Sequence, residues 1–202
     1  MLGEPITATI HLVRHGEVEN PKGVIYGRLP GYNLSERGRW QAEEASRHLS
    51  TADVGSVWAS PLERAQETAA VIASQHTIDI VTDERLTESD TTFEGVGRKL
   101  LSFVSPRHWW RLRNPWTPSW GESFAEIRRR MLEAISDALA SAAGRNVVLV
   151  SHQTPVLVAR LALAQRGVPP WLGRVPCSTG SVSTIRLEEG IVVKSDYFAP
   201  GV

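Results

Sequence analysis

The stretch Ile10-His11-Leu12-Val13-Arg14-His15-Gly16-Glu17 decides the fold: a short apolar run ends in a charged and polar segment. A second stretch far along the chain, Val147-Val148-Leu149-Val150-Ser151-His152-Gln153, has the same form. Short apolar runs of this kind are typical of buried strands in a parallel sheet. The carboxyl ends of neighbouring parallel strands open onto one crevice, where ligands bind. We therefore expect His15 and His152 to lie together at that crevice.

The composition indicates one ordinary globular domain. The chain has 202 residues, of which 42% are hydrophobic and 22% are charged. Lys plus Arg and Asp plus Glu each number 22, so no net charge favours nucleic acid or an anionic membrane as a partner. The single cysteine, Cys177, excludes an intrachain disulfide. We expect residues 1–202 to form a single domain.

The apolar runs also bear on localisation. None approaches the ~18 residues of a membrane span. The start of the sequence carries Glu4 and lacks a basic region followed by an apolar one, so it does not resemble a secretory signal. We expect a cytoplasmic protein with no membrane partner.

Strand-like and helix-like segments alternate along the chain. This alternation predicts an α/β fold: a three-layer αβα sandwich around a mostly parallel sheet. Glu188-Glu189-Gly190 separates the last two strands and predicts a hairpin, which would add an antiparallel edge. The expected strands lie near 8–14, 55–59, 78–82, 147–151, 181–187 and 191–197, and the expected helices near 36–49, 61–75, 123–142 and 155–166.

Two helix starts carry capping signals. Ser60 precedes a proline and lies three residues before Glu63, which predicts a capping box with proline at the first helical position. Ser123 and Glu126 repeat the box before an amphipathic helix. We interpret the arginine triplet 128–130 in that helix as a solvated flank rather than a nucleic-acid contact.

One segment interrupts the alternation. Residues 105–120 read SPRHWWRLRNPWTPSW and hold four of the seven tryptophans. We interpret the region of about 89–121 as a lid-like insertion packed over the crevice. Its arginines (Arg107, Arg111 and Arg113) and tryptophans suit either substrate specificity or a homodimer interface.

The residues at the crevice suggest attack on phosphorus. A neutral imidazole is a competent nucleophile near pH 7, and Gly16 lets the backbone approach a phosphate beside His15. Arg14 and Arg64 can each bind two phosphate oxygens, and Arg64 lies in the first turn of a predicted helix. His152 would contribute a further phosphate contact.

A proton donor for the leaving oxygen is also needed. Glu88 is the candidate acid–base group, although the sequence alone does not select it over Glu84 or Glu94.

Taken together, these segments resemble the histidine phosphatase superfamily, the phosphoglycerate mutase-like group. The resemblance covers nearly the whole chain, and its motifs follow in the expected order. They are Leu12–Glu17, Ser60–Ala69, Leu86–Glu88 with Glu94-Gly95, Gly121–Ser123, Val150–His152, and Tyr26–Arg28 with Leu34–Gly38.

The resemblance implies a set of roles. His15 would become phosphorylated, with Arg14, Arg64 and His152 around the phosphoryl oxygens. Glu88 would give a proton to the leaving oxygen and later take one from water. No metal and no cofactor is implied, because these side chains supply the charge that Mg²⁺ supplies in kinases.

Three further residues are candidate substrate contacts. The family often places Asn six residues after the nucleophile, whereas here Pro21 occupies that position and Asn20 comes one residue earlier. Arg28 belongs to the matching Tyr26–Arg28 segment. Gln153 stands where glycine commonly follows the second histidine, and its amide could turn toward the phosphate.

The resemblance favours a phosphatase of the histidine acid phosphatase type, acting on a small phosphomonoester. Mutases of the family carry a longer insertion and a Tyr-Gly-containing stretch after the acid–base Glu, whereas Glu88 here precedes SDTTFEG. Three alternatives remain: a mutase, a metal-dependent hydrolase using His15, His152 and nearby carboxylates as ligands, and a catalytically silent phospho-ligand binder. Chelator sensitivity would identify a metal-dependent hydrolase, and loss of activity in a folded His15→Ala variant would exclude a silent binder. An isomerisation assay would identify a mutase.

Overall fold

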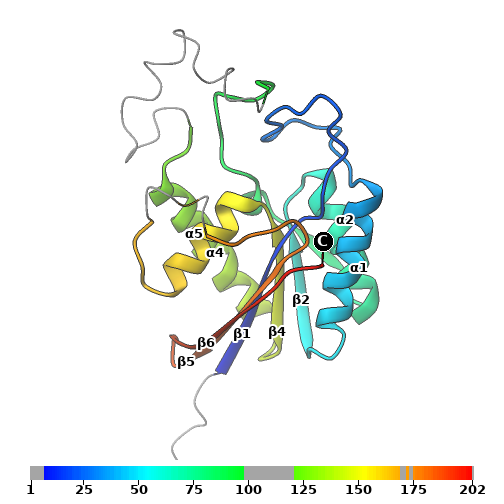
Figure 1. Ribbon diagram of the computed structural model, residues 1–202. Coiled ribbons are helices and arrows are strands. Elements are labelled where there is room, and N and C mark those ends of the chain that lie inside the picture. Colours follow the sequence, from blue (N-terminus) through cyan, green and yellow to red (C-terminus); the bar gives the residue numbers. More distant parts are fainter. Residues whose placement is uncertain (1–6, 98–120, 169–171, 173–174, 202) are drawn as a thin grey trace, which may run out of the picture.

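The computed structural model describes residues 7–97, 121–168, 172 and 175–201, and a six-stranded sheet forms its centre (Figure 1). The strand order across the sheet is β3-β2-β4-β1-β5-β6. The strands are β1 (Thr7–Arg14), β2 (Val54–Ala59), β3 (Ile80–Thr82), β4 (Asn146–Ser151), β5 (Val182–Glu188) and β6 (Ile191–Phe198).

The sheet is mixed, as the sequence predicted. β1, β4, β2 and β3 run parallel to one another. β5 pairs antiparallel with both β1 and β6, so β5 and β6 form an antiparallel edge. The β5–β6 hairpin turns at Glu189 and Gly190, which have φ angles of 51° and 78°. Positive φ at both central residues matches the twist of a two-residue hairpin.

Helices cover both faces of the sheet (Figure 1). α1 (Glu36–Leu49) and α2 (Glu63–His76) pack on one face over a core that includes Val13 and Val148. α4 (Phe124–Ser141) and α5 (Gln153–Leu163) pack on the other face over Leu12 and Leu149. The adjacent residues of β1 and β4 therefore point into opposite cores, which is why both strands are apolar throughout.

One predicted cap is confirmed and one is wrong. Ser123 and Glu126 form the expected capping box at the start of α4. α2 instead begins at Glu63 with Leu62 as its N-cap and no side-chain cap hydrogen bond. The Ser60 hydroxyl accepts a long hydrogen bond from the Leu62 N–H at 3.4 Å and lies 2.8 Å from His152 Nε2.

The three consecutive arginines of α4 differ in their exposure to solvent. Arg128 and Arg129 are exposed as expected, whereas Arg130 is only 9% exposed. The interpretation of a solvated flank is therefore wrong for Arg130, which points inward and forms ion pairs there.

The core of the predicted insertion, residues 98–120, lies outside the described residues. Its described ends meet, because Thr91 and Gly121 form an antiparallel bridge. Within the described part of the chain, no helix has the length and apolar character needed to cross a membrane.

Candidate active site

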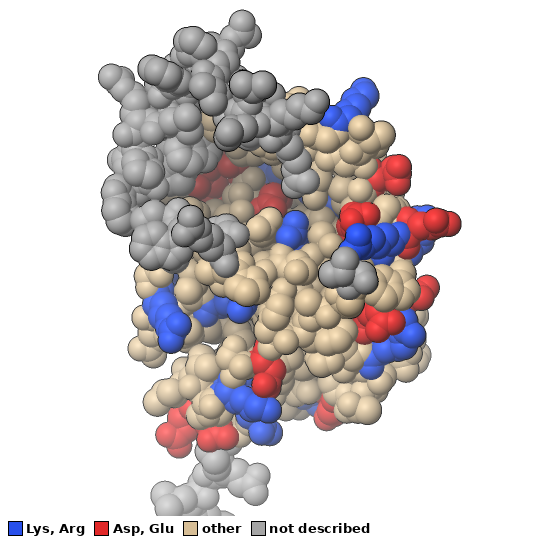
Figure 2. Space-filling view, viewed as in Figure 1, with Lys and Arg blue, Asp and Glu red and all other residues tan. Residues whose placement is uncertain are grey.

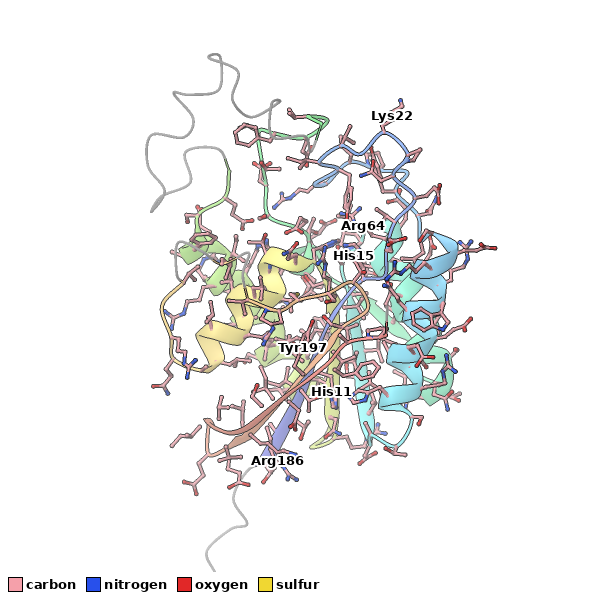
Figure 3. All side chains as sticks on the ribbon, viewed as in Figure 1. His11, His15, Lys22, Arg64, Arg186 and Tyr197 are labelled. Atoms are coloured by element: carbon pink, nitrogen blue, oxygen red, sulfur yellow. The ribbon has the colours of Figure 1, made fainter. Side chains whose placement is uncertain are left out.

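The two histidines meet at the carboxyl end of the sheet. β1 pairs in parallel with β4 so that Arg14 lies opposite Ser151, which brings the next residues, His15 and His152, side by side. Their ring centroids are 5.0 Å apart at an interplanar angle of 60°. Both side chains are almost fully buried. Figure 3 places His15 beside Arg64 at this end of the sheet.

The protonation of His15 follows from one short contact. Its Nδ1 lies 2.6 Å from the carbonyl oxygen of Gly16. A carbonyl oxygen only accepts hydrogen bonds, so Nδ1 carries the proton and Nε2 keeps its lone pair. The Gly16 N–H in turn donates to the Thr68 hydroxyl at 3.1 Å, which fixes the backbone of this loop.

The surroundings of His15 keep its imidazole neutral. Burial lowers the pKa of His15 well below 6.5, and the cations Arg64 and Arg14 lower it further. The hydrogen bond to Gly16 raises the pKa but is the smaller effect. A neutral imidazole with a free Nε2 is the form that attacks an electrophile.

Arg64 is a fully buried guanidinium that the protein only partly satisfies. Its Nη2 donates to the carbonyl oxygen of Gly27 at 2.6 Å, and its guanidinium lies 4.8 Å from the centroid of the Tyr26 ring. Its Nε and Nη1 have no hydrogen-bond partner. Burial lowers the pKa of Arg64, so this arrangement carries a cost that a bound anion would relieve.

Arg14 and His152 show the same pattern. Arg14 Nη1 donates to the carbonyl oxygen of Cys177 at 2.5 Å, whereas its Nε is buried and unpartnered. His152 Nε2 lies 2.8 Å from the Ser60 hydroxyl, and its Nδ1 has no partner. Unpartnered buried polar atoms are rare in proteins and call for an explanation. A single anion bound beside His15 would give all three side chains a partner.

The surroundings of His152 also keep its imidazole neutral. Burial lowers its pKa well below 6.5, and His15 and Arg64 lower it further. The site therefore holds two neutral imidazoles between guanidinium groups.

A cavity of about 310 Å³ opens next to these residues. Arg14, Tyr26 and Gly27 connect it to the histidine site, and Glu88 lies in its wall. Figure 2 shows acidic side chains inside a hollow on this face. The other residues that line the cavity are Ile25, Ser89, Asp90, Thr91, Glu122, Phe124, Ile127, Gln153, Thr154 and Leu172.

The geometry separates Glu88 from the other two acidic candidates. The Glu88 carboxylate accepts hydrogen bonds from the backbone N–H of Ser89 at 2.8 Å and from its hydroxyl at 3.2 Å. Glu84 instead contacts Thr87, and Glu94 accepts from the backbone N–H of Arg28. Neither Glu84 nor Glu94 lines the cavity.

The three candidate substrate contacts have different surroundings. Gln153 lines the cavity as the first residue of α5. The Asn20 amide group is bonded to the backbone of Val24 through both its oxygen and its nitrogen, and it borders a separate surface cavity. Arg28 donates to the Glu88 carbonyl oxygen and to Glu122, which occupies much of its guanidinium.

Sequence reasoning missed three residues of the site: Ser60, Thr68 and Tyr26. All three lie inside stretches that the resemblance quotes, but nothing in their spacing marks them as contacts. Ser60 was assigned to a helix cap because its pattern fits one equally well. In the structure, its hydroxyl lies beside His152 because β2 and β4 are neighbours in the sheet.

The chain matches a known protein family over most of its length. The model of the histidine phosphatase superfamily (branch 1) matches residues 10–196. This chain belongs to the histidine phosphatase superfamily. Its enzymatic class is accordingly that of a phosphatase or a mutase.

The sequence relatives include both classes. The uncharacterized protein Rv0525 of Mycobacterium tuberculosis is 44% identical, covering 97% of this chain and 98% of its own length. A 2,3-bisphosphoglycerate-dependent phosphoglycerate mutase of Thermoplasma acidophilum is 30% identical, covering 90% of this chain and 88% of its own. Phosphoserine phosphatase 1 of Hydrogenobacter thermophilus is also 30% identical, and the match covers 88% of this chain and 86% of its own length.

The solved structures agree on the fold. The mycobacterial glucosyl-3-phosphoglycerate phosphatase Rv2419c in complex with VO3 is 26% identical, with a TM-score of 0.74, and covers 88% of this chain and 92% of its own. The expected α/β sandwich of the phosphoglycerate mutase-like type is confirmed.

Proposed function

We propose that this protein is a phosphomonoester hydrolase that works through a phosphohistidine on His15. The observation that carries the proposal is the set of unpartnered buried nitrogens on Arg64, Arg14 and His152 around a neutral His15. A tetrahedral anion with several oxygens would satisfy these donors together.

In the first step, Nε2 of His15 attacks the phosphorus atom and the bond from phosphorus to the ester oxygen breaks. The Nδ1–H bond to the Gly16 carbonyl stabilises the positive charge that develops on the ring. Arg64 and Arg14 stabilise the charge on the phosphoryl oxygens. Glu88 donates its proton to the departing alkoxide, which leaves as an alcohol.

In the second step, water enters the cavity and attacks the phosphohistidine. Glu88, now a carboxylate, accepts a proton from this water, and the bond from phosphorus to Nε2 breaks. Inorganic phosphate leaves, and both His15 and Glu88 return to their starting forms. The guanidinium groups supply the positive charge, so we propose that neither step requires a metal or another cofactor.

We favour a phosphatase over a mutase for this chain. The resemblance supports this choice, because the longer insertion and the Tyr-Gly stretch of family mutases are missing after Glu88. The named relatives do not decide it, because a mutase and a phosphatase are equally similar. The cytoplasmic location, the small-molecule substrate and the homodimer remain predictions.

The test is phosphate release from small phosphomonoesters in the presence of a chelator, for the wild type and His15→Ala. The panel contains an aryl phosphate, 3-phosphoglycerate, sugar phosphates and phosphoserine. Release by the wild type alone supports the proposal. Loss of activity in chelator would instead indicate a metal-dependent hydrolase. If no ester is hydrolysed, isomerisation of phosphoglycerate indicates a mutase, and its absence indicates a silent binder.

A further inference from the structure

The segment that carries Glu88 is held by donors from three distant parts of the chain. Arg130 Nη1 donates to the carbonyl oxygen of Arg85 at 2.5 Å, and the Ser151 hydroxyl donates to that of Leu86 at 2.6 Å. Arg28 Nε donates to the carbonyl oxygen of Glu88 itself at 2.7 Å. Three of the four carbonyl groups from Arg85 to Glu88 are thus fixed from outside.

Glu122 connects two of these donors. Its Oε1 accepts from Arg130 Nε at 2.7 Å, and its Oε2 accepts from Arg130 Nη2 at 2.9 Å. Oε2 also accepts from Arg28 Nη2 at 3.2 Å. The side chains of Arg130 and Glu122 are only 11% and 14% exposed, so solvent screens this pair little. The two-point pairing with Glu122 fixes the orientation of the Arg130 guanidinium. Arg28 is held by its single bond to Glu122 together with its bond to the Glu88 carbonyl oxygen.

The Glu88 carboxylate depends on this backbone for its place. Its hydrogen bonds are to its own neighbour, Ser89, which moves with it. The position of the carboxylate in the cavity therefore follows the position of the Arg85–Glu88 backbone. A displacement of about 1 Å of a reacting group is enough to cost on the order of 100-fold in rate.

We propose that Arg130, Glu122 and Arg28 are positioning residues that hold Glu88 where it protonates the leaving oxygen. This inference rests on the proposed function. Glu122 also lines the cavity, but both its oxygens already accept hydrogen bonds from guanidinium groups. Its part is therefore to orient the arginines.

The test compares two leaving groups. An alkyl phosphate needs a proton on its departing oxygen, whereas an aryl phosphate of a strongly acidic phenol departs without one. For Arg130→Met, we expect kcat/KM to fall by roughly 10- to 100-fold for the alkyl ester, because general acid catalysis contributes at least that much. For the aryl ester, the change should stay within a few-fold. Because kcat/KM covers the steps up to formation of phosphohistidine, later hydrolysis does not enter.

Matched variants accompany this measurement. Arg128→Met removes an exposed arginine from the same helix and should leave both esters unchanged. In a Glu88→Gln background, the further change Arg130→Met should have almost no effect on the alkyl ester, because the proton donor is already gone. Arg130→Lys keeps the charge but loses the planar guanidinium, and it should restore little of the kcat/KM for the alkyl ester.

The outcomes separate the positioning proposal from the proposed function. Equal loss for both esters, or a full additional loss in the Glu88→Gln background, would overturn the positioning role while leaving the phosphohistidine route intact. Hydrolysis of the aryl ester by His15→Ala would overturn the proposed function instead. If Arg130→Met does not fold, Arg28→Met decides by the same comparison, because that side chain is 40% exposed and its loss perturbs the core less.

Discussion

At the scale of single residues, the site combines groups that the folded chain satisfies poorly. Arg64 is fully buried and two of its nitrogens have no partner, which opposes folding in the absence of a ligand. His15 is kept neutral by burial and by neighbouring cations, although an exposed histidine would be partly charged near pH 6.5. Such costs are typical of sites arranged for a bound anion.

Replacing Arg64 by Met should separate activity from stability. We expect the free energy of unfolding in phosphate-free buffer to rise by roughly 1–2 kcal/mol, because an apolar side chain of similar length replaces a poorly paired buried charge. Phosphatase activity should fall by about 100-fold or more, because a donor to the phosphoryl oxygens is lost. Urea unfolding and steady-state kinetics measure the two effects. A clearly less stable variant would mean that Arg64 is primarily structural.

The tautomer and charge of His15 can be observed directly. Ring ¹⁵N chemical shifts should show a neutral imidazole with its proton on Nδ1, with no titration as the pH falls from 7.5 to 6. The reason is that burial, Arg64 and Arg14 hold its pKa well below 6.5. The urea-unfolded chain is the control and should titrate near 6.5. A midpoint near 6.5 in the folded protein would contradict this environment.

At the scale of elements, the loop after β1 and the start of α1 approach each other closely beside the nucleophile. A Cβ atom on Gly38, in the first turns of α1, would lie 1.9 Å from the carbonyl oxygen of Glu17. A Cβ on Gly16 would lie 2.3 Å from the carbonyl oxygen of Gly38. The backbone after His15 therefore rests against the start of α1 with no room for a side chain.

This contact makes Gly38→Ala an informative variant. In an open helix the change would stabilise by about 1 kcal/mol, because alanine is the better helix former. Here we expect a loss of at least 1–3 kcal/mol from the steric conflict with Glu17, together with reduced activity. Thermal unfolding checks the sign, and Arg37→Ala on the exposed side of the helix should change little. A higher melting temperature for Gly38→Ala would refute the close approach.

The elements also show what the sequence could predict. In the described part of the chain, the expected segments match the six strands and the four long helices within a few residues. The buried strands and the helices have regular apolar patterns, whereas the exposed β6 follows from the hairpin signal before it. The roles of polar side chains were harder to predict, because the same sequence pattern fits more than one structural role. Ser60 fits a helix cap and Arg130 fits a solvated flank, yet both point inward. Their partners, His152 and Glu122, lie close only after the sheet and helices have packed.

At the scale of the whole molecule, the fold buries several histidines. His11 on β1 is 5% exposed, and its pKa is lowered to about 4 by burial and, to a lesser extent, by His48 and His76. Figure 3 shows His11 in the sheet, away from His15 at the carboxyl end of β1. With His15 and His152, three buried imidazoles remain neutral in the folded chain at a pH where they would be charged in the unfolded chain.

Stability should therefore fall as the pH is lowered. Below pH 6.5 the unfolded chain binds protons that the folded chain does not, and this continues down to the lowered folded pKa values. For His11 the window runs from 6.5 to about 4, with a loss of up to about 1.4 kcal/mol per pH unit. Urea unfolding between pH 7.5 and 5 measures the slope, and His11→Gln should make it shallower. A flat profile would contradict neutral buried histidines.

The most direct test of the central claim is to trap the phosphorylated protein during turnover of an aryl phosphate. The reaction is quenched in base, and the peptide that contains His15 is examined by mass spectrometry. The account predicts one phosphoryl group on His15, lost on acid treatment and missing when the experiment is repeated with His15→Ala. Turnover with no phosphorylated His15, or a phosphoryl group on another side chain, would contradict it.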